Sequence, residues 1–320
     1  MNFIEIPSID DIAYFVGTNS RAENNAANRI REDILTCLYS DIPNEYFTNE
    51  TYGKIWRNVC DEFKTAIESL AKDIEYTLVE LEKKAGMSHN YDFIVKYLDS
   101  NRYVVKSIKL EFKNNNVSID KLPQFLELYD KDMAGKYDMI EYTYSEFYYN
   151  NYLDDYLALD DTIIVDKPDL AVYLDKVRDI KYNHPFFNNL YKSKLNMKKE
   201  KQELVDASIR AYLQDYAPNF NFTEIEKKIK ESQTNKTFLF WNGSSFIIDT
   251  INVDEIEIVG IKKINDKFVD LDVKGIKFDL RLRFNWGNNN GVANGVANNF
   301  GLRGKIKLQE IIISKNTRSE

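Results

Sequence analysis

Apolar residues recur at four-residue spacing early in the chain, which is the pattern of an amphipathic helix. The apolar positions of the first such segment, Ala22–Tyr39, are Ala26, Ile30, Ile34 and Leu38. A second helix is predicted over Ile55–Ala85, where helical periodicity is accompanied by alternating charge and Gly86 provides a stop. The first part of the chain is therefore predicted to be helical.

The pattern then changes to runs of β-branched and aromatic residues. Tyr91–Leu98 and Tyr103–Lys113 are such runs, and the polar residues Asp99–Arg102 separate them. This arrangement predicts a β-hairpin. Because side chains alternate along a strand, Glu111 and Lys113 are expected to share one face of the second strand.

Helical patterns return in the middle of the chain, and short strands separated by turns follow toward its end. We predict helices over Leu122–Leu128, Tyr142–Tyr156, Leu204–Leu213 and Ile225–Lys230, and strands within Phe238–Leu282 and over Lys305–Ser314. The polar, basic stretch Lys192–Gln202 predicts a soft boundary between residues 1–190 and 191–320. Together these elements predict an α+β protein with an α/β core and a β-rich C-terminal region.

The composition indicates a folded, reduced, intracellular protein. Two cysteines, Cys37 and Cys60, are too few for a disulfide framework, and two histidines leave them without partners for a zinc site. The first residues lack a basic leader, and no apolar run is long enough to span a membrane, so we expect neither secretion nor membrane insertion. The tyrosines of Tyr142–Tyr156 could stack on bases, but we favour an amphipathic helix with its tyrosines packed at the margin.

The charge is unevenly distributed along the chain. The net charge of -8 by itself argues against a nucleic-acid partner. Val273–Glu320, however, carries nine Lys or Arg against three acids, an excess of six positive charges that leaves −14 on the rest. Such an asymmetry is typical of a local patch that meets phosphate, and a solvated basic edge explains it equally well.

The predicted hairpin brings together residues suited to phosphodiester hydrolysis. Folding Asp92 back beside the second strand would place it near Glu111 and Lys113. Two carboxylates suit Mg²⁺, which prefers hard oxygen ligands, and a neighbouring lysine can position or deprotonate the attacking water. An exposed strand face with a surface ion pair would show the same spacing, so the spacing leaves both readings open.

This order of elements resembles the core of the PD-(D/E)xK nucleases, as found in many type II restriction endonucleases. Asp92 stands where the family has its first metal-binding acid, with Tyr91 in place of the proline, and Glu111 and Lys113 match the second half of the motif. The segment KLEFKNNNVSIDKLPQFLEL adds to the likeness, which extends over about residues 19–128.

The resemblance implies a restriction-endonuclease-like core, a mixed sheet flanked by helices, within residues 1–190. It implies Mg²⁺, with Mn²⁺ able to substitute, held by Asp92, Glu111 and the Phe112 carbonyl, and Lys113 as a catalytic group. Glu23 resembles the acid that many such nucleases carry on their first core helix. The expected activity is site-specific cleavage of double-stranded DNA. The protein is expected in the cytoplasm or bound to DNA. A homodimer is expected if both strands are cut together, because each strand then needs its own active site.

Alternatives are a repair or RNA nuclease with the same core, and a non-enzymatic nucleic-acid-binding protein.

Recognition of DNA is expected in residues 191–320. Alternation along Phe278–Phe284 puts two arginines on one face, and an Asn-rich loop follows. Arg can pair with guanine and Asn with adenine, although a merely exposed loop would look similar. The candidate DNA-contacting residues are Arg281, Arg283, Asn285, Asn288, Asn289, Asn290 and, through the resemblance, Gln124.

Overall fold

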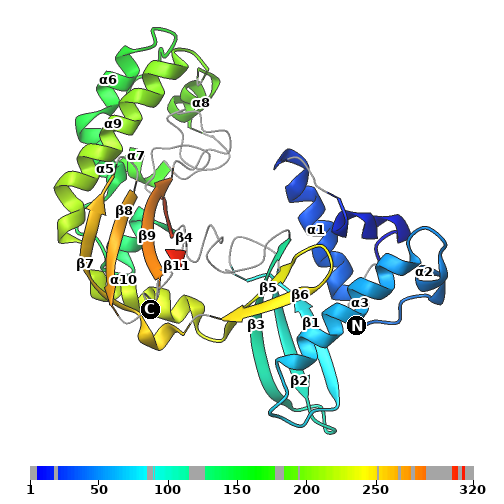
Figure 1. Cartoon of the computed structure of the whole chain (residues 1–320). Helices are drawn as coiled ribbons and strands as arrows, with labels where there is room; N and C mark the ends of the chain where they lie inside the picture. Colours follow the sequence, from blue (N-terminus) through cyan, green and yellow to red (C-terminus); the bar gives the residue numbers. More distant parts are fainter. Residues whose placement is uncertain are drawn as a thin grey trace, which may run out of the picture. The chain divides into compact units, whose positions relative to one another are not determined.

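The computed structural model consists of two compact units, which are drawn in Figure 1. The first unit comprises Met1–Lys121 and Gln233–Asn252, and the second comprises Leu122–Ser232 and Val253–Glu320. The residues that the structure describes are 6–17, 21–84, 89, 91–114, 127–176, 184–193, 195–250, 252–265, 268–274, 278–285, 305–308 and 312–313. Within them, no helix combines the length and apolar character that crossing a membrane requires.

The first unit is built on a five-stranded mixed sheet with the order β1-β2-β3-β5-β6. Its strands are β1 (Leu78–Lys83), β2 (Phe93–Leu98), β3 (Val104–Asn114), β5 (Lys236–Trp241) and β6 (Phe246–Thr250). Neighbouring strands are antiparallel except β3 and β5, which are parallel. Residues Leu122–Ser232 of the second unit lie between β3 and β5 in the sequence. Because β3 and β5 are parallel, the chain crosses to the opposite end of the sheet before β5 begins.

Helices pack against one face of this sheet. They are η1 (Ile9–Phe15), α1 (Arg21–Cys37), α2 (Asn44–Thr48) and α3 (Gly53–Ser69). Figure 1 shows α3 alongside the sheet, and the contacts join α1 to β1 and α3 to β6. The core between them contains fully buried aromatic side chains, including Trp56, Phe63 and Phe93. The predicted helix over Ala22–Tyr39 and the predicted hairpin are confirmed, with the turn closed by the Asp99 N–H donating to the Tyr103 carbonyl.

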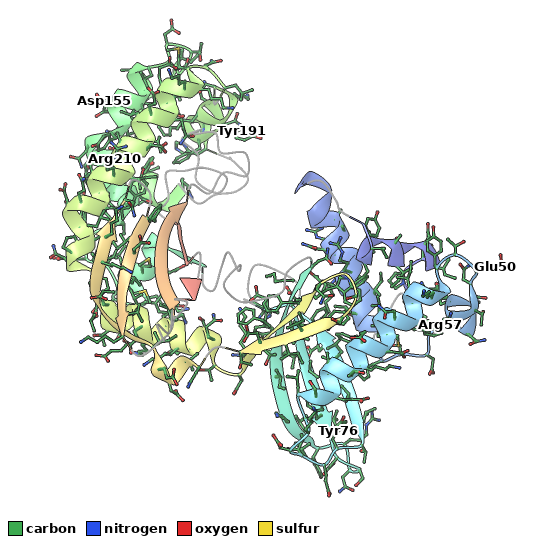
Figure 2. All side chains as sticks on the ribbon, viewed as in Figure 1. Glu50, Arg57, Tyr76, Asp155, Tyr191 and Arg210 are labelled. Atoms are coloured by element: carbon green, nitrogen blue, oxygen red, sulfur yellow. The ribbon has the colours of Figure 1, made fainter. Side chains whose placement is uncertain are left out.

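The long helix predicted over Ile55–Ala85 is wrong in its second half. The helix ends at Ser69, and Leu78–Lys83 forms the edge strand β1 against β2. Tyr76, labelled in Figure 2, precedes this strand, and its ring packs edge-on against Tyr97 with centroids 5.1 Å apart. Pairing with β2 and burial of Val79 override the helical pattern, because strand preference depends strongly on cross-strand neighbours.

The second unit combines helices with a separate sheet of order β4-β10-β9-β8-β7, in which β11 also pairs with β9. The helices are α4 (Asp130–Gly135), α5 (Tyr144–Asn151), α6 (Leu153–Ala158), α7 (Leu170–Lys176), α8 (Pro185–Lys192), α9 (Lys198–Tyr216), η3 (Ala217–Asn219), α10 (Phe222–Gln233) and η4 (Val253–Glu255). The strands are β4 (Glu127–Tyr129), β7 (Glu257–Ile264), β8 (Phe268–Lys274), β9 (Phe278–Asn285), β10 (Lys305–Leu308) and β11 (Ile312–Ile313).

Two sequence predictions differ from this arrangement. The predicted helix over Leu122–Leu128 is wrong at its end, where Glu127 and Leu128 belong to β4, and its earlier residues lie outside the described ones. The predicted division at residue 190 also does not coincide with the units, which interleave along the chain. The apolar strand β5 pairs with β3 of the first unit, and such pairing between distant segments leaves no mark in local composition.

The Tyr-rich segment packs against the rest of the second unit, as predicted. Tyr144, Tyr148 and Tyr156 are almost completely buried. The hydroxyl of Tyr144 hydrogen-bonds with the Ser208 hydroxyl at 2.8 Å, and the Tyr212 hydroxyl donates to the Tyr142 carbonyl at 2.5 Å. These contacts tie α5 and Tyr142 just before it to α9, and they give the hydroxyls of Tyr144 and Tyr212 the polar partners that buried tyrosines usually have.

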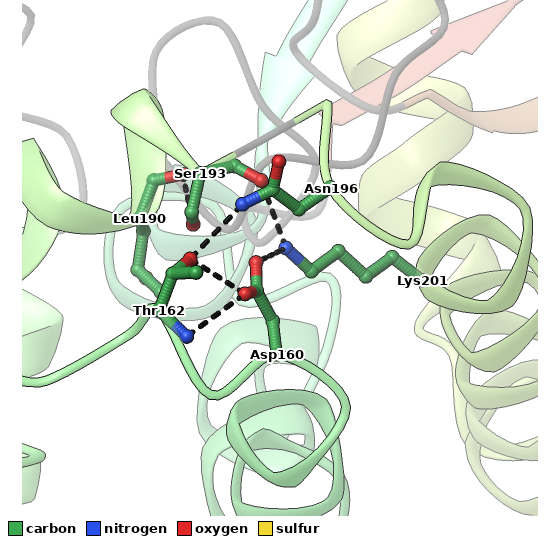
Figure 3. A network of polar contacts seen from close by, with 6 residues as sticks. All are labelled: Asp160, Thr162, Leu190, Ser193, Asn196 and Lys201. Carbon is green, nitrogen blue, oxygen red and sulfur yellow. Dashed lines mark hydrogen bonds and ion pairs between the residues drawn. The ribbon is translucent and has the colours of Figure 1, made fainter.

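A buried ion pair also joins helices of the second unit (Figure 3). Lys201 Nζ lies 2.6 Å from Asp160 Oδ2 and donates to the Ser193 carbonyl at 3.0 Å. The Thr162 N–H and hydroxyl donate to Asp160 Oδ1. Burial would raise the pKa of Asp160, but the hydrogen bonds from Lys201 and Thr162 outweigh burial and lower that pKa. The basic stretch that suggested a linker is therefore anchored by Lys201 in a folded core.

Replacing Lys201 by Met should lower the free energy of unfolding by about 3 kcal/mol or more, because Asp160 would be left as an uncompensated buried charge. Urea unfolding followed by circular dichroism measures this effect. Lys199→Met is the matched control, since Lys199 is 82% exposed and lies 3.8 Å from Glu203. The control should change stability by less than about 0.5 kcal/mol. Equal unfolding midpoints for the two variants would contradict the assigned role of Lys201.

Candidate functional site

Asp92 and the Glu111-Phe112 segment meet at one end of the β2–β3 ladder. Phe93 pairs with Leu110, so Asp92, just before β2, lies beside the residues that follow Leu110 on β3. The Phe112 N–H donates to Asp92 Oδ2 at 2.8 Å, and the Asp92 N–H donates to the Leu110 carbonyl at 2.9 Å. These bonds hold the Asp92 carboxyl group against the strand that carries Glu111.

Glu111 is held between two lysines. Lys113 Nζ lies 2.7 Å from Glu111 Oε1, and Lys236 Nζ forms an ion pair with Glu111 Oε2. Glu111 and Lys113 share a strand face, as expected, while Lys236 comes from the first residue of β5. In the parallel β3–β5 register, Lys236 lies opposite Lys109 and Phe238 lies opposite Glu111. Residues two apart on adjacent strands thus meet on one face of the sheet.

The site is largely shielded from water, and this burial dominates its electrostatics. Burial raises the pKa of Asp92, the charge of Lys113 opposes this shift, and the charge of Glu111 adds to it. Burial would lower the pKa of Lys113, but Glu111 and Asp92 outweigh burial and raise that pKa. Lys113 therefore carries its positive charge at neutral pH, which favours an orienting role over the role of a base.

The sequence did not single out two further residues of this site. Glu32, on α1, forms an ion pair with Lys83 at 3.3 Å. Burial raises the pKa of Glu32, and the negative charge of Asp92 raises it further, so α1 places an acid within electrostatic reach of Asp92. Glu32 stands in a run of charged residues, and Lys236 opens a strand far along the chain, so neither has a local signal.

Glu23, the acid suggested by the resemblance, lies in α1. Its side chain is outside the described residues, so its role stays a prediction. Glu32 belongs to the same helix and is the acid whose charge acts on Asp92. Among acids of α1 with described side chains, Glu32 is therefore the stronger candidate for the site.

The donor set fits a hard divalent cation with two carboxylate ligands. Among the described residues, no group of three or more His, Cys, Asp or Glu side chains is arranged to hold a metal ion. Asp92 and Glu111 nevertheless offer carboxylate oxygens at one end of the β2–β3 ladder, where the Phe112 N–H donates to Asp92 Oδ2, and a metal contact of the Phe112 carbonyl stays a prediction. Mg²⁺ is commonly held by one or two carboxylates, with water and substrate phosphate completing its shell.

The candidate DNA-contacting residues fall in the second unit or outside the described residues. Arg281, Arg283 and Asn285 are in β9, where Arg281 lies opposite Asp270 and Arg283 opposite Phe268 and Lys307. Their side chains are not among those described, and Gln124, Asn288, Asn289 and Asn290 lie outside the described residues altogether. Contact of these residues with DNA stays a prediction.

A comparison with protein-family models finds no match, and a comparison with curated proteins finds no significant one. The chemistry of the site therefore has to be interpreted from its own residues. Those residues are two carboxylates at the end of a hairpin, a cationic lysine on the more open side, and a second, fully buried lysine behind Glu111.

Proposed function

We propose that this protein is a Mg²⁺-dependent, site-specific endonuclease that hydrolyses phosphodiester bonds of double-stranded DNA. The observation that supports this most is the meeting of Asp92 and Glu111 at one end of the β2–β3 ladder, with Lys113 Nζ 2.7 Å from Glu111. The mixed sheet with helices packed on it also agrees with the restriction-endonuclease-like core that the sequence resembles. Substrate, metal and activity are parts of this proposal.

The residues of the site would have different roles in hydrolysis. Asp92 and Glu111, with the Phe112 carbonyl, would hold Mg²⁺, which supplies a Lewis acid that offsets charge developing on the phosphate. The side chain of Lys113 is 31% exposed, whereas that of Lys236 is completely buried, so Lys113 is the lysine better placed to meet a substrate. The ammonium group of Lys113 would orient the attacking water and stabilise negative charge in the transition state.

Attraction to DNA has to come largely from elsewhere, because the site itself needs two acids. The excess of six positive charges in Val273–Glu320 makes the C-terminal strands and loop of the second unit the proposed DNA-binding part. Cutting both strands at once would require two active sites, so we propose that two copies act together.

Incubating the purified protein with a plasmid and Mg²⁺ tests the proposal. We expect discrete linear fragments with Mg²⁺ or Mn²⁺ and no cleavage in EDTA. A smear, or cleavage of RNA in parallel, would instead indicate a repair or RNA nuclease with the same core. DNA binding without any metal-dependent cleavage would overturn the enzymatic proposal and favour a nucleic-acid-binding protein.

A further inference from the structure

Lys236 is an ammonium group placed deep in the protein. Its side chain is completely buried, whereas the side chain of Lys113 is 31% exposed. The ion pair with Glu111 Oε2 is its charged contact, and the described residues supply its Nζ with no further hydrogen-bond acceptor. The Nζ atom also lies 4.9 Å above the ring of Phe238, which offers a weak cation–π contact.

Burying the ammonium group of Lys236 is energetically unfavourable if the residue serves only the fold. Removing an ammonium group from water carries a desolvation penalty, and an apolar residue of similar size often serves the fold equally well. Every residue of β5 is buried, so an apolar side chain at its first position would match the rest of the strand. A role for the charge itself therefore explains Lys236 better than packing does.

Each carboxylate oxygen of Glu111 forms an ion pair with a different lysine. Lys236, whose side chain is completely buried, pairs with Oε2, and Lys113, whose side chain is 31% exposed, pairs with Oε1. An incoming cation can reach Oε1 by replacing this partly exposed partner. To reach Oε2, it would have to displace a buried ammonium group anchored on a central strand.

We propose that Lys236 is a positioning residue for Glu111, which fixes Oε2 and leaves Oε1 as the oxygen offered to the metal ion. This inference rests on the proposed metal-dependent function. Lys236 does not reach the substrate itself, because its side chain is completely buried. Its effect is transmitted through the orientation of the Glu111 carboxylate, in the manner of groups that orient metal ligands.

The test is the affinity of Lys236→Met for Mn²⁺, measured by electron paramagnetic resonance without any nuclease assay. If Lys236 positions Glu111, Lys236→Met should bind Mn²⁺ about 10–100-fold more weakly than the wild type does. Lys109→Met is the matched control, since Lys109 lies opposite Lys236 on β3 and its Nζ lies 3.4 Å from the Thr234 carbonyl and not on Glu111. Loss of that nearby positive charge should leave Mn²⁺ affinity unchanged or slightly higher.

The two explanations of Lys236 thus predict opposite signs. If Lys236→Met binds Mn²⁺ as tightly as, or more tightly than, Lys109→Met, Lys236 acts only as a nearby charge and the positioning role is overturned. If the wild type itself binds no Mn²⁺, the proposed function fails and the positioning role fails with it.

A crystal structure of the wild type soaked in Mn²⁺ tests the same inference without any variant, in case Lys236→Met does not fold. We expect the ion on Glu111 Oε1, with Lys236 still paired to Oε2. An ion on Oε2 with Lys236 displaced would overturn the positioning role, although it would still agree with the proposed function.

Discussion

Asp92→Asn is expected to abolish Mg²⁺-dependent cleavage without weakening the fold. Losing one of two carboxylate ligands should remove several kcal/mol of transition-state stabilisation, which corresponds to a loss of rate on the order of 10³-fold or more. The Asn side chain keeps an oxygen that can accept the hydrogen bond from the Phe112 N–H. The unfolding free energy should therefore be equal to or higher than that of the wild type.

The expected sign of the stability change follows from the raised pKa of Asp92, which is due first to burial and is reinforced by Glu111. Because the pKa is higher in the folded protein than in the unfolded chain, the folded state binds this proton more tightly. The contribution of Asp92 to stability then falls as the pH rises from the ordinary aspartate pKa through the raised value. At neutral pH the carboxylate opposes folding, and an uncharged side chain removes that opposition.

Asp160→Asn provides the contrasting control for the same chemical change. Hydrogen bonds from Lys201 and Thr162 outweigh burial and lower the pKa of Asp160, so its carboxylate stabilises the fold at neutral pH. Urea unfolding at neutral pH in EDTA should show Asp160→Asn less stable than the wild type and Asp92→Asn at least as stable. A strongly destabilised Asp92→Asn would mean that Asp92 serves the fold, and undiminished cleavage would remove it from the active site.

The second large effect is expected for Lys113→Ala. Removing a group that orients the attacking water should lower the turnover number by about 10²–10⁴-fold. Binding of DNA in the presence of Ca²⁺ should change little, because a single ammonium group makes a small share of the phosphate contacts of the whole protein. Single-turnover cleavage and fluorescence anisotropy measure these two quantities separately.

Lys109→Ala is the matched control for this variant. Lys109 lies four residues before Lys113 on the same face of β3, and its ammonium group is 5.8 Å from the Tyr91 ring and not on Glu111. We expect Lys109→Ala to cleave at nearly the wild-type rate. Weakened DNA binding with an unchanged turnover number in Lys113→Ala would contradict the proposed role and make Lys113 a phosphate-binding residue.

Features that depend on neighbouring positions along the chain were predictable from the amino-acid sequence. Alternation of side chains predicted the hairpin and the shared face of Glu111 and Lys113, and four-residue periodicity predicted α1. These patterns are local, because one helical turn or one strand pleat spans only a few residues. The predicted hairpin also implied that Asp92 lies beside the strand that carries Glu111 and Lys113.

Features that depend on distant partners became visible only in the folded protein. Leu78–Lys83 became a strand because β2 was present to pair with it, and Lys236 entered the site because β5 lies parallel to β3 after the inserted unit. Glu32 is distinguished from its charged neighbours by the negative charge of Asp92, which adds to the effect of burial in raising the pKa of Glu32. Burial and strand pairing between distant segments set these outcomes, since a buried charge is tolerated only where the fold supplies its counter-charge.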